Sequence, residues 1–253
     1  MELTILGSGT GVPTKKRGAS GYLLRVQECR ILFDSGPGTI GKLAQIGVGL
    51  HELDAVFYTH FHPDHSLELG AIIFALMNPS FDGEIESLRV VGPPGLRRFY
   101  EGLKGLYGGW VTPSSYRLHL EEVAPTGDEI QVGPVRISAW KMVHNDESQG
   151  YRVTGPGGES LAYTGDTDIG PDLIKLARGV DVLVCESSHP DGHHVAGHLT
   201  PRRAGRVARE AGCARLVLTH FYPDCEGRDL VAQCRKEFEG EIVLAEDLMT
   251  ISI

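Results

Sequence analysis

The chain has 253 residues, of which 41% are hydrophobic and 23% are charged, and its net charge is −9. This composition is typical of globular proteins, and the length suits one large domain or two small ones. The negative charge argues against tight nonspecific binding of nucleic acid, which rests on many phosphate contacts from lysine and arginine. No apolar run approaches the roughly 20 residues that span a bilayer, so no membrane association is expected.

In the first half of the chain, short apolar runs rich in β-branched and aromatic residues alternate with helical patterns. Strands are predicted at 2–6, 21–26, 30–33, 54–59 and 87–92, and helices at 38–47, 67–77 and 93–107. The segment 108–134 holds glycine, proline and polar residues. It is therefore expected to be a loop-rich insertion or a seam between two halves.

The same alternation resumes after this segment. Strands are predicted at 135–140, 150–154, 160–164, 180–186, 214–220, 241–246 and 249–253, and helices at 171–179, 201–212 and 227–238. Two successive strand-and-helix halves predict an α/β fold, with residues 1–253 forming a single domain.

Cysteine usage bears on the cellular compartment. The five cysteines are scattered and form no CxxC pair. A disulfide framework or a thiolate zinc site is therefore not expected. The N-terminal stretch MELTILGSGT lacks the basic region and the long apolar region of a signal peptide. Together these features predict a cytoplasmic protein.

Metal-competent side chains follow several of the predicted strands. DAVFYTH ends at His60, SLAYTGD at Asp166, ARLVLTH at His220 and VDVLVCE at Glu186. A rigid strand aims the residue at its end, and sites in open α/β sheets form where such ends meet. These side chains are therefore expected to converge.

The stretch THFHPDH carries four such residues, His60, His62, Asp64 and His65. Imidazole and carboxylate suit borderline divalent metals, with zinc expected first and manganese or iron as alternatives. One ion cannot easily use four ligands packed this closely, so two ions are expected, and a carboxylate can bridge them. The further ligands that complete the two sets are His144, Asp166 and His220.

Two alternatives to a catalytic metal site are an incidental polar loop and a structural metal site. Structural zinc sites are closed and usually contain cysteine. Five histidines and two carboxylates without cysteine favour an open, catalytic site instead.

The HxHxDH motif at 60–65, followed by His144, Asp166 and His220, resembles the metallo-β-lactamase superfamily over nearly the whole chain. The resemblance implies a four-layer αββα sandwich with a dinuclear zinc site between two β-sheets. It also implies the division of the ligands. His60, His62 and His144 would hold one ion, Asp64, His65 and His220 the other, and Asp166 would bridge.

Two further motifs resemble the ribonuclease Z branch. In LGSGTGVPTKKRGAS, Pro13, Lys15 and Arg17 match the opening loop of that branch, while Gly18 stands where asparagine is expected. CESS (185–188) and GHLTP (197–201) resemble its HEAT and HST motifs, with Cys185 in place of the first histidine. The resemblance implies that His198, oriented by Glu186, assists the leaving group.

One departure separates the chain from ribonuclease Z. The short segment between His144 and Asp166 leaves no room for the long arm that grips tRNA in that branch. In this respect the chain is also similar to the small cyclic phosphodiesterases of phosphonate degradation. Relatives of both kinds cleave phosphodiesters, and the resemblance further implies a homodimer.

The expected activity is thus that of a metal-dependent phosphodiesterase acting on a small-molecule or RNA-derived substrate. Water bridging two dications has a lowered pKa and supplies hydroxide. Asp64 can orient this nucleophile, and His198 can protonate the departing alkoxide. The alternatives are a lactonase or thioesterase on the same scaffold, a tRNA 3′-processing endoribonuclease, and a metal-binding protein without catalysis. The sequence assigns no role to His189, His193 and His194.

Overall fold

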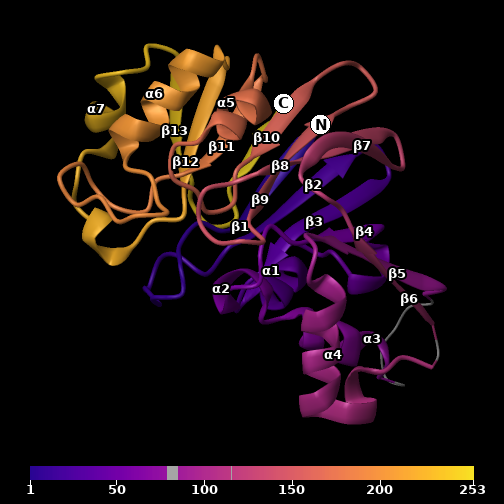
Figure 1. Ribbon diagram of the computed structural model, residues 1–253. Helices are drawn as coiled ribbons and strands as arrows, with labels where there is room; N and C mark the ends of the chain where they lie inside the picture. The colour runs from indigo at the N-terminus through magenta and orange to yellow at the C-terminus, as the bar shows by residue number, and fades with distance from the viewer. Residues whose placement is uncertain (79–84, 115) are drawn as a thin grey trace.

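The computed structural model describes residues 1–78, 85–114 and 116–253. In this part of the chain, two seven-stranded sheets pack face to face, and helices cover the outer face of each sheet (Figure 1). The strand orders are β14-β1-β2-β3-β4-β5-β6 and β13-β12-β11-β10-β9-β8-β7. The layers are those of the αββα sandwich, as predicted.

The first sheet is built almost wholly from the first half of the chain. Its strands are β1 (Glu2–Gly7), β2 (Gly21–Val26), β3 (Cys29–Ser35), β4 (Ala55–Phe57), β5 (Ser87–Gly92), β6 (Arg117–Glu122) and β14 (Thr250–Ser252). The helices of this half are α1 (Thr39–Gln45), α2 (Pro63–Ser66), α3 (Leu69–Leu76) and α4 (Leu96–Tyr107), with 3₁₀ turns at Leu50–Glu52 and Gly108–Val111. β14 pairs with β1, with Leu3 opposite Ile251.

The second sheet and its helices come from the second half. The strands are β7 (Thr126–Val132), β8 (Val135–Lys141), β9 (Gln149–Thr154), β10 (Ser160–Tyr163), β11 (Val182–Glu186), β12 (Arg215–Thr219) and β13 (Glu241–Leu244). The helices are α5 (Pro171–Ala177), α6 (Pro201–Ala211) and α7 (Leu230–Arg235), with a 3₁₀ turn at Pro223–Cys225. None of the helices in the described ranges is long and apolar enough to cross a membrane.

The core follows the two-residue period of the strands. In β2, Tyr22 and Leu24 point between the two sheets, whereas Leu23 points outward to the layer of α1 and α3. Aromatic rings fill the space between the sheets, where Phe33 lies 5.4 Å from Phe57 and 5.7 Å from Tyr151 by ring centroids. Both faces of the first sheet are therefore buried, which explains its nearly continuous apolar strands.

The expectation of a loop-rich insertion at 108–134 is wrong for about half of its length, but the alternative, a seam between two halves, is confirmed, because the segment joins β6 of the first sheet to β7 of the second. About half of this segment forms β6 and β7, Gly108–Val111 forms a 3₁₀ turn, and Ser115 lies outside the described residues. β6 and β7 are the edge strands of the two sheets. Because an edge strand is partly solvated, it keeps polar residues, and both strands lack the apolar runs by which the inner strands were recognised.

The strand directions bring the predicted site residues to one edge of the sandwich. β3, β4 and β5 run parallel in the first sheet, and β10 to β13 run parallel in the second. Residues 60–66 follow β4, and the second sheet contributes Asp166 after β10, Glu186 at the end of β11 and His220 after β12. Carboxyl ends of parallel strands are where α/β sheets build their sites.

Candidate functional site

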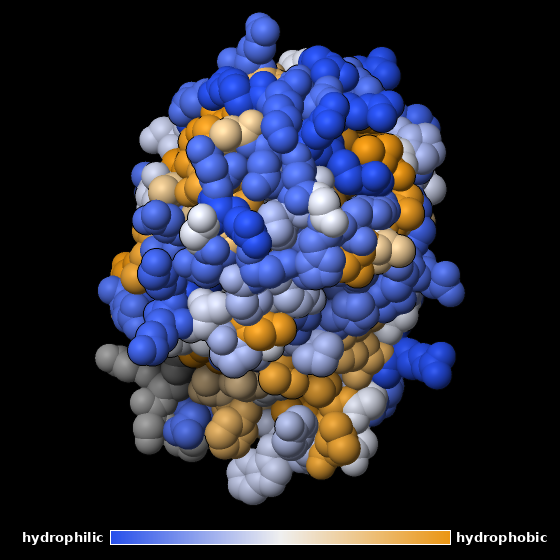
Figure 2. All heavy atoms as spheres, turned by 90° about the vertical axis from the view of Figure 1, so that its left-hand side faces the viewer, coloured by the Kyte–Doolittle hydropathy of each residue, from blue (hydrophilic) through white to orange (hydrophobic). Residues whose placement is uncertain are grey.

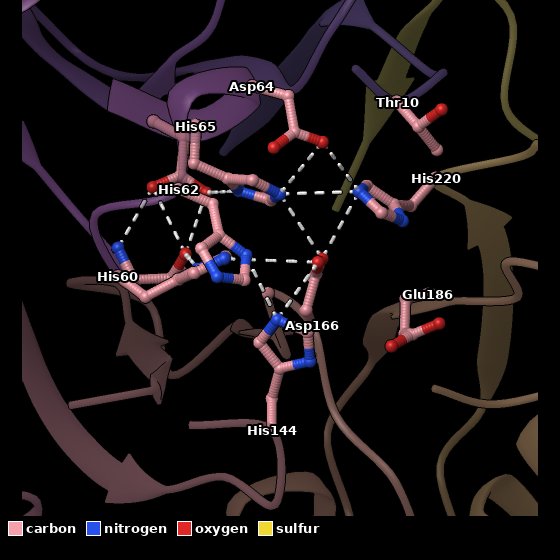
Figure 3. Close-up of polar contacts among 12 residues, drawn as sticks. Thr10, His60, His62, Asp64, His65, His144, Asp166, Glu186 and His220 are labelled. Atoms are coloured by element: carbon pink, nitrogen blue, oxygen red, sulfur yellow. Dashed lines mark hydrogen bonds and ion pairs between the residues drawn. The ribbon is translucent and has the colours of Figure 1, made fainter. Parts of the chain in front are cut away.

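The turn after β4 is shaped by its own sequence. Pro63 begins the short helix α2, a position where the missing N–H costs nothing. The Ser66 hydroxyl donates to the carbonyls of Phe61 and His62, at 3.1 and 3.0 Å, and closes the turn. As a result, the stretch His60–His65 directs its three imidazoles and the Asp64 carboxylate toward one point (Figure 3).

The first predicted ligand set is assembled from three loops. His62 Nδ1 lies 3.1 Å from His144 Nε2. Asp166 Oδ2 lies 3.7 Å from His144 Nε2 and 3.9 Å from His60 Nε2. The four ligand atoms all lie within 4.8 Å of one another, close enough to share one ion.

The second set lies on the other side of Asp166. His65 Nε2 is 3.2 Å from His220 Nε2, and Asp64 Oδ2 is 3.5 Å from the same nitrogen. Asp166 Oδ1 is 3.2 Å from His65 Nε2 and 3.3 Å from His220 Nε2. Figure 3 shows Asp166 between the two groups, and the aspartate presents a different oxygen to each. These two groups of neighbouring side chains could each hold an ion.

Asp166 reaches this position because a glycine precedes it. Gly165 has φ +57, and a Cβ there would lie 2.7 Å from the Cβ of Thr59. A residue without a side chain accepts both the left-handed backbone and the close approach to the turn after β4. The position of Asp166 between the two groups therefore depends on Gly165.

The residues fit a pair of divalent cations. His60 Nε2 is enclosed by protein and has no hydrogen-bond partner in the described part of the chain, although an unpaired buried polar atom is costly. Burial lowers the pKa of His60 well below its usual range and lowers that of His144, which favours the neutral imidazole that binds metal. Burial alone would raise the pKa of Asp166, but His220 and His65 hold it well below its usual range. The site thus offers two neutral imidazoles, those of His60 and His144, beside an ionised carboxylate.

Asp34 is a site residue that the sequence reasoning missed. It is fully buried at the end of β3, and its Oδ2 lies 2.8 Å from His65 Nδ1. The same carboxylate accepts hydrogen bonds from the Thr59 amide at 2.8 Å and the Tyr163 hydroxyl at 2.7 Å. Because Asp34 accepts a hydrogen bond from Nδ1–H of His65, Nε2 of His65 is free to bind a metal ion. The signal was present, because Asp34 is another carboxylate directly after an apolar strand.

Glu186 and His198 form a buried pair next to the ligand cluster. Glu186 Oε1 lies 3.0 Å from His198 Nδ1, and Oε2 accepts from the amide of Leu199 at 3.1 Å. Burial alone would lower the pKa of His198, but the hydrogen bond and charge of Glu186 raise it to about 9. His198 therefore carries a proton at neutral pH, as a general acid requires.

Ser188 is a second residue without a predicted role. Its hydroxyl lies 2.6 Å from Glu186 Oε2, 3.1 Å from His198 Nδ1 and 3.0 Å from His220 Nδ1. Ser188 thus joins the Glu186–His198 pair to one of the predicted metal ligands. Ser188 is the last residue of the CESS motif, but nothing in the sequence distinguished it from an ordinary loop residue.

The glycine-rich N-terminal loop touches the site in a way that the motif did not predict. The amide of Gly11 donates to Asp64 Oδ2 at 2.9 Å. Arg17 instead lies over the ring of Phe221 at 4.5 Å and donates to the Ser8 hydroxyl at 2.7 Å. The backbone of this loop therefore faces the site, whereas Arg17 holds the loop in place.

An apolar cavity of about 650 Å³ adjoins the ligand turn. Phe61, which lies between two predicted ligands in the sequence, stacks on Phe99 of α4 at 4.9 Å and forms one wall. Arg98 supplies a positive charge, and Asp146 and Glu147 supply negative ones. A volume of this size suits a small organic ligand.

Comparisons with known proteins agree with this geometry. The family described as Beta-lactamase superfamily domain matches residues 29–221. A ribonuclease Z of Streptomyces avermitilis is 32% identical over 302 aligned positions, covering 100% of this chain and 97% of that protein. Because these positions outnumber the 253 residues of the chain, that relative carries residues that this chain lacks.

Two solved structures are similar over their whole length. The metallo-β-lactamase fold protein YhfI of Bacillus subtilis has a TM-score of 0.86 at 25% identity, covering 99% of this chain and 98% of that one. The short form of human tRNase Z has a TM-score of 0.80 at 27% identity, covering 100% and 99%. The chain therefore belongs to the metallo-β-lactamase superfamily and, within it, to the ribonuclease Z-like hydrolases.

Proposed function

We propose that the protein is a phosphodiesterase of the ribonuclease Z-like type that works without a tRNA-gripping arm and uses two divalent ions, with zinc expected first. The observation that carries this proposal is the position of the Glu186–His198 pair. The ligand atom of His198 lies within 4.8 Å of those of Asp166 and His220. A proton donor at this distance from a metal pair suits cleavage of a bond with a poor leaving group.

The proposed ligands are those predicted from the sequence. His60, His62 and His144 would hold one ion, Asp64, His65 and His220 the other, and Asp166 both. When bound, two such ions activate water at neutral pH and stabilise charge on the phosphoryl oxygens. Manganese and iron remain alternatives to zinc because the donors are nitrogen and oxygen only.

The remaining steps belong to side chains of the chain itself. The amide of Gly11 holds one oxygen of Asp64, and the carboxylate of Asp64 orients the attacking water. Glu186 holds His198 through Nδ1, which leaves Nε2 to donate its proton to the departing alkoxide. A positioned general acid contributes about 10²–10⁴-fold to the rate.

The surroundings of the site favour a small substrate over folded RNA. Between His144 and Asp166 the chain forms only β9, β10 and their short connection, so the described structure holds no arm there. The cavity beside Phe61 and Phe99 would receive the organic group of the diester, with Arg98 near its phosphate. A tRNA 3′-processing endoribonuclease is the second candidate, supported by the relative named ribonuclease Z.

A lactonase or thioesterase is the third candidate, and the apolar lining of that cavity favours it. The two chemistries differ in their need for a general acid. A phosphodiester with a poor leaving group needs the proton of His198, whereas attack on a lactone or thioester carbonyl relies far less on it.

The test compares substrates and variants on one sample. We expect the zinc- or manganese-loaded protein to hydrolyse a nucleoside 3′-alkyl phosphodiester faster than a lactone or a thioester. His198→Ala should lower phosphodiester turnover about 10²-fold or more. His119→Ala removes an exposed histidine on β6 and serves as the matched control. If the protein cleaves the lactone or thioester but not the phosphodiester, and this cleavage persists in His198→Ala, the lactonase or thioesterase is the better assignment.

We also propose that the chain self-associates. Large apolar side chains stand exposed around a groove between α3 and the end of α4, and hydrophobic residues gather at that end of the molecule in Figure 2. Trp110 is 70% exposed and Leu67 is 57% exposed, and both line this groove. Exposure of this kind marks an interaction surface, and a second copy of the chain is the occupant that we propose.

A further inference from the structure

The loop after β11 carries three histidines to which the proposed reaction assigns no role. His194 has a partner outside the loop, because its Nε2 lies 2.9 Å from Asp168 Oδ2. His189 and His193 point elsewhere. Their Nδ1 atoms lie 3.0 and 2.6 Å from one oxygen, Oδ2 of Asp224, which comes from the turn after β12.

Local sequence brings the two histidines together. In the stretch His189–His193, the amide of His193 donates to the Pro190 carbonyl at 3.1 Å, and Gly192 has φ +91. Glycine at the third position of such a turn supplies the positive φ without strain. The rings of His189 and His193 consequently lie 4.6 Å apart between centroids.

The loop is also fixed from outside. The amide of Asp191 donates to Gln233 Oε1 at 2.6 Å, and Asp191 Oδ1 accepts from the amide of Arg202 at 3.2 Å. These contacts tie the tip of the loop to α7 and to the start of α6. The two imidazoles are thus held in place before any ligand arrives.

From this arrangement we infer that His189, His193 and Asp224 form an additional transition-metal site, separate from the ligand cluster around Asp166. Their ligand atoms all lie within 4.8 Å of one another. Among the described residues, the second oxygen of Asp224, Oδ1, is enclosed and has no hydrogen-bond partner, and a cation held by both oxygens of the carboxylate would supply one. Two imidazoles and one carboxylate with an open fourth position suit zinc.

The site joins two loops that carry residues of the main centre. His189 stacks on Tyr222 at 4.6 Å, and the ring of Tyr222 lies 6.2 Å from His198 and 6.0 Å from His220. A metal ion on His189, His193 and Asp224 would cross-link the loop before His198 to the loop after His220. It would therefore fix the position of the proposed general acid without touching the substrate.

The test counts metal ions and does not depend on catalysis. Protein stripped with chelator is titrated with zinc sulfate by calorimetry, and bound zinc per chain is measured by mass spectrometry after dialysis. We expect His193→Asn to bind one zinc fewer than the unmodified chain, whatever number the main centre holds. His194→Asn, an exposed neighbour in the same loop, should bind the full number.

The same comparison in an Asp166→Ala background separates this site from the main centre. In that background, addition of His193→Asn should again lower the count by one zinc per chain. This expectation does not depend on the proposals about hydrolysis. Equal zinc counts in His193→Asn and the unmodified chain would overturn the inference and leave the two histidines as hydrogen-bond donors to Asp224. An equal loss in His194→Asn would also overturn it, because the zinc would then bind the loop unspecifically.

Discussion

Replacement of Asp34 by asparagine tests whether a residue outside the ligand set controls metal affinity. Asp34 has φ +56, a conformation that asparagine accepts more readily than most residues, so the backbone can stay in place. The shape of the side chain is kept as well. The change removes one negative charge and converts one acceptor oxygen into an NH₂ donor.

Neither orientation of the new amide satisfies its neighbours. With the NH₂ in the Oδ1 position, it faces the amide N–H of Thr59, which now lies 2.8 Å from that oxygen. With the NH₂ in the Oδ2 position, it faces His65 Nδ1 and shifts the ring proton to Nε2, the atom proposed to bind metal. Both orientations also remove the carboxylate that increases the basicity of His65. Loss of such a partner costs about 10–100-fold in metal affinity, or roughly 1.4–2.7 kcal/mol.

Zinc affinity is measured by competition between the protein and a chromophoric chelator for zinc. The unfolding free energy of the metal-free protein is measured alongside. Tyr163→Phe is the control, because it removes a hydrogen bond to the same carboxylate oxygen but leaves the carboxylate on His65. It should cost about 1 kcal/mol of stability and leave zinc affinity nearly unchanged. Two zinc ions bound by Asp34→Asn with unaltered affinity would refute the reasoning.

Three other predictions concern pH, metal removal and assembly. Since Glu186 raises the pKa of His198 to about 9 against the effect of burial, phosphodiester turnover should fall as the pH rises, with a midpoint no higher than about 9. Glu186→Gln should move this midpoint to lower pH, and an unmoved pH–rate profile would contradict the pairing. Chelation should abolish turnover and lower the melting temperature, whereas free zinc at 100 times its Kd should restore about 2.7 kcal/mol per site. Trp110→Ser should lower the mass measured by light scattering, whereas Val12→Ser, a control at an exposed apolar residue that does not line the groove, should not.

The sequence was most informative where strands are buried on both faces. β4, β10, β11 and β12 are almost wholly apolar, so their ends could be recognised and the polar residues that follow stood out. The predicted ligand His60 and the predicted bridge Asp166 were found for this reason. The meeting of those ends in space follows from parallel pairing, which the alternation of strands and helices indicated.

The sequence was least informative about edges and supporting contacts. β6 and β7 keep polar residues because one side of each lacks a partner strand. Asp34 and Ser188 act through hydrogen bonds to histidines that are distant in the chain, and no local pattern records such a bond. The apolar cavity beside Phe61 likewise depends on how α4 packs, which spacing alone does not determine.

The return of the last strand to the first sheet has a consequence for biosynthesis. β14 pairs with β1, and between β13 and β14 Asp247 accepts hydrogen bonds from Ser8 and Gly18 and pairs with Lys42. The N-terminal glycine loop, whose Gly11 amide holds Asp64, therefore gains its anchor only when the C-terminal residues have left the ribosome. A chain without residues 247–253 would lose this anchor and expose the edge of β1 that β14 covers, so it should be aggregation-prone as well as inactive.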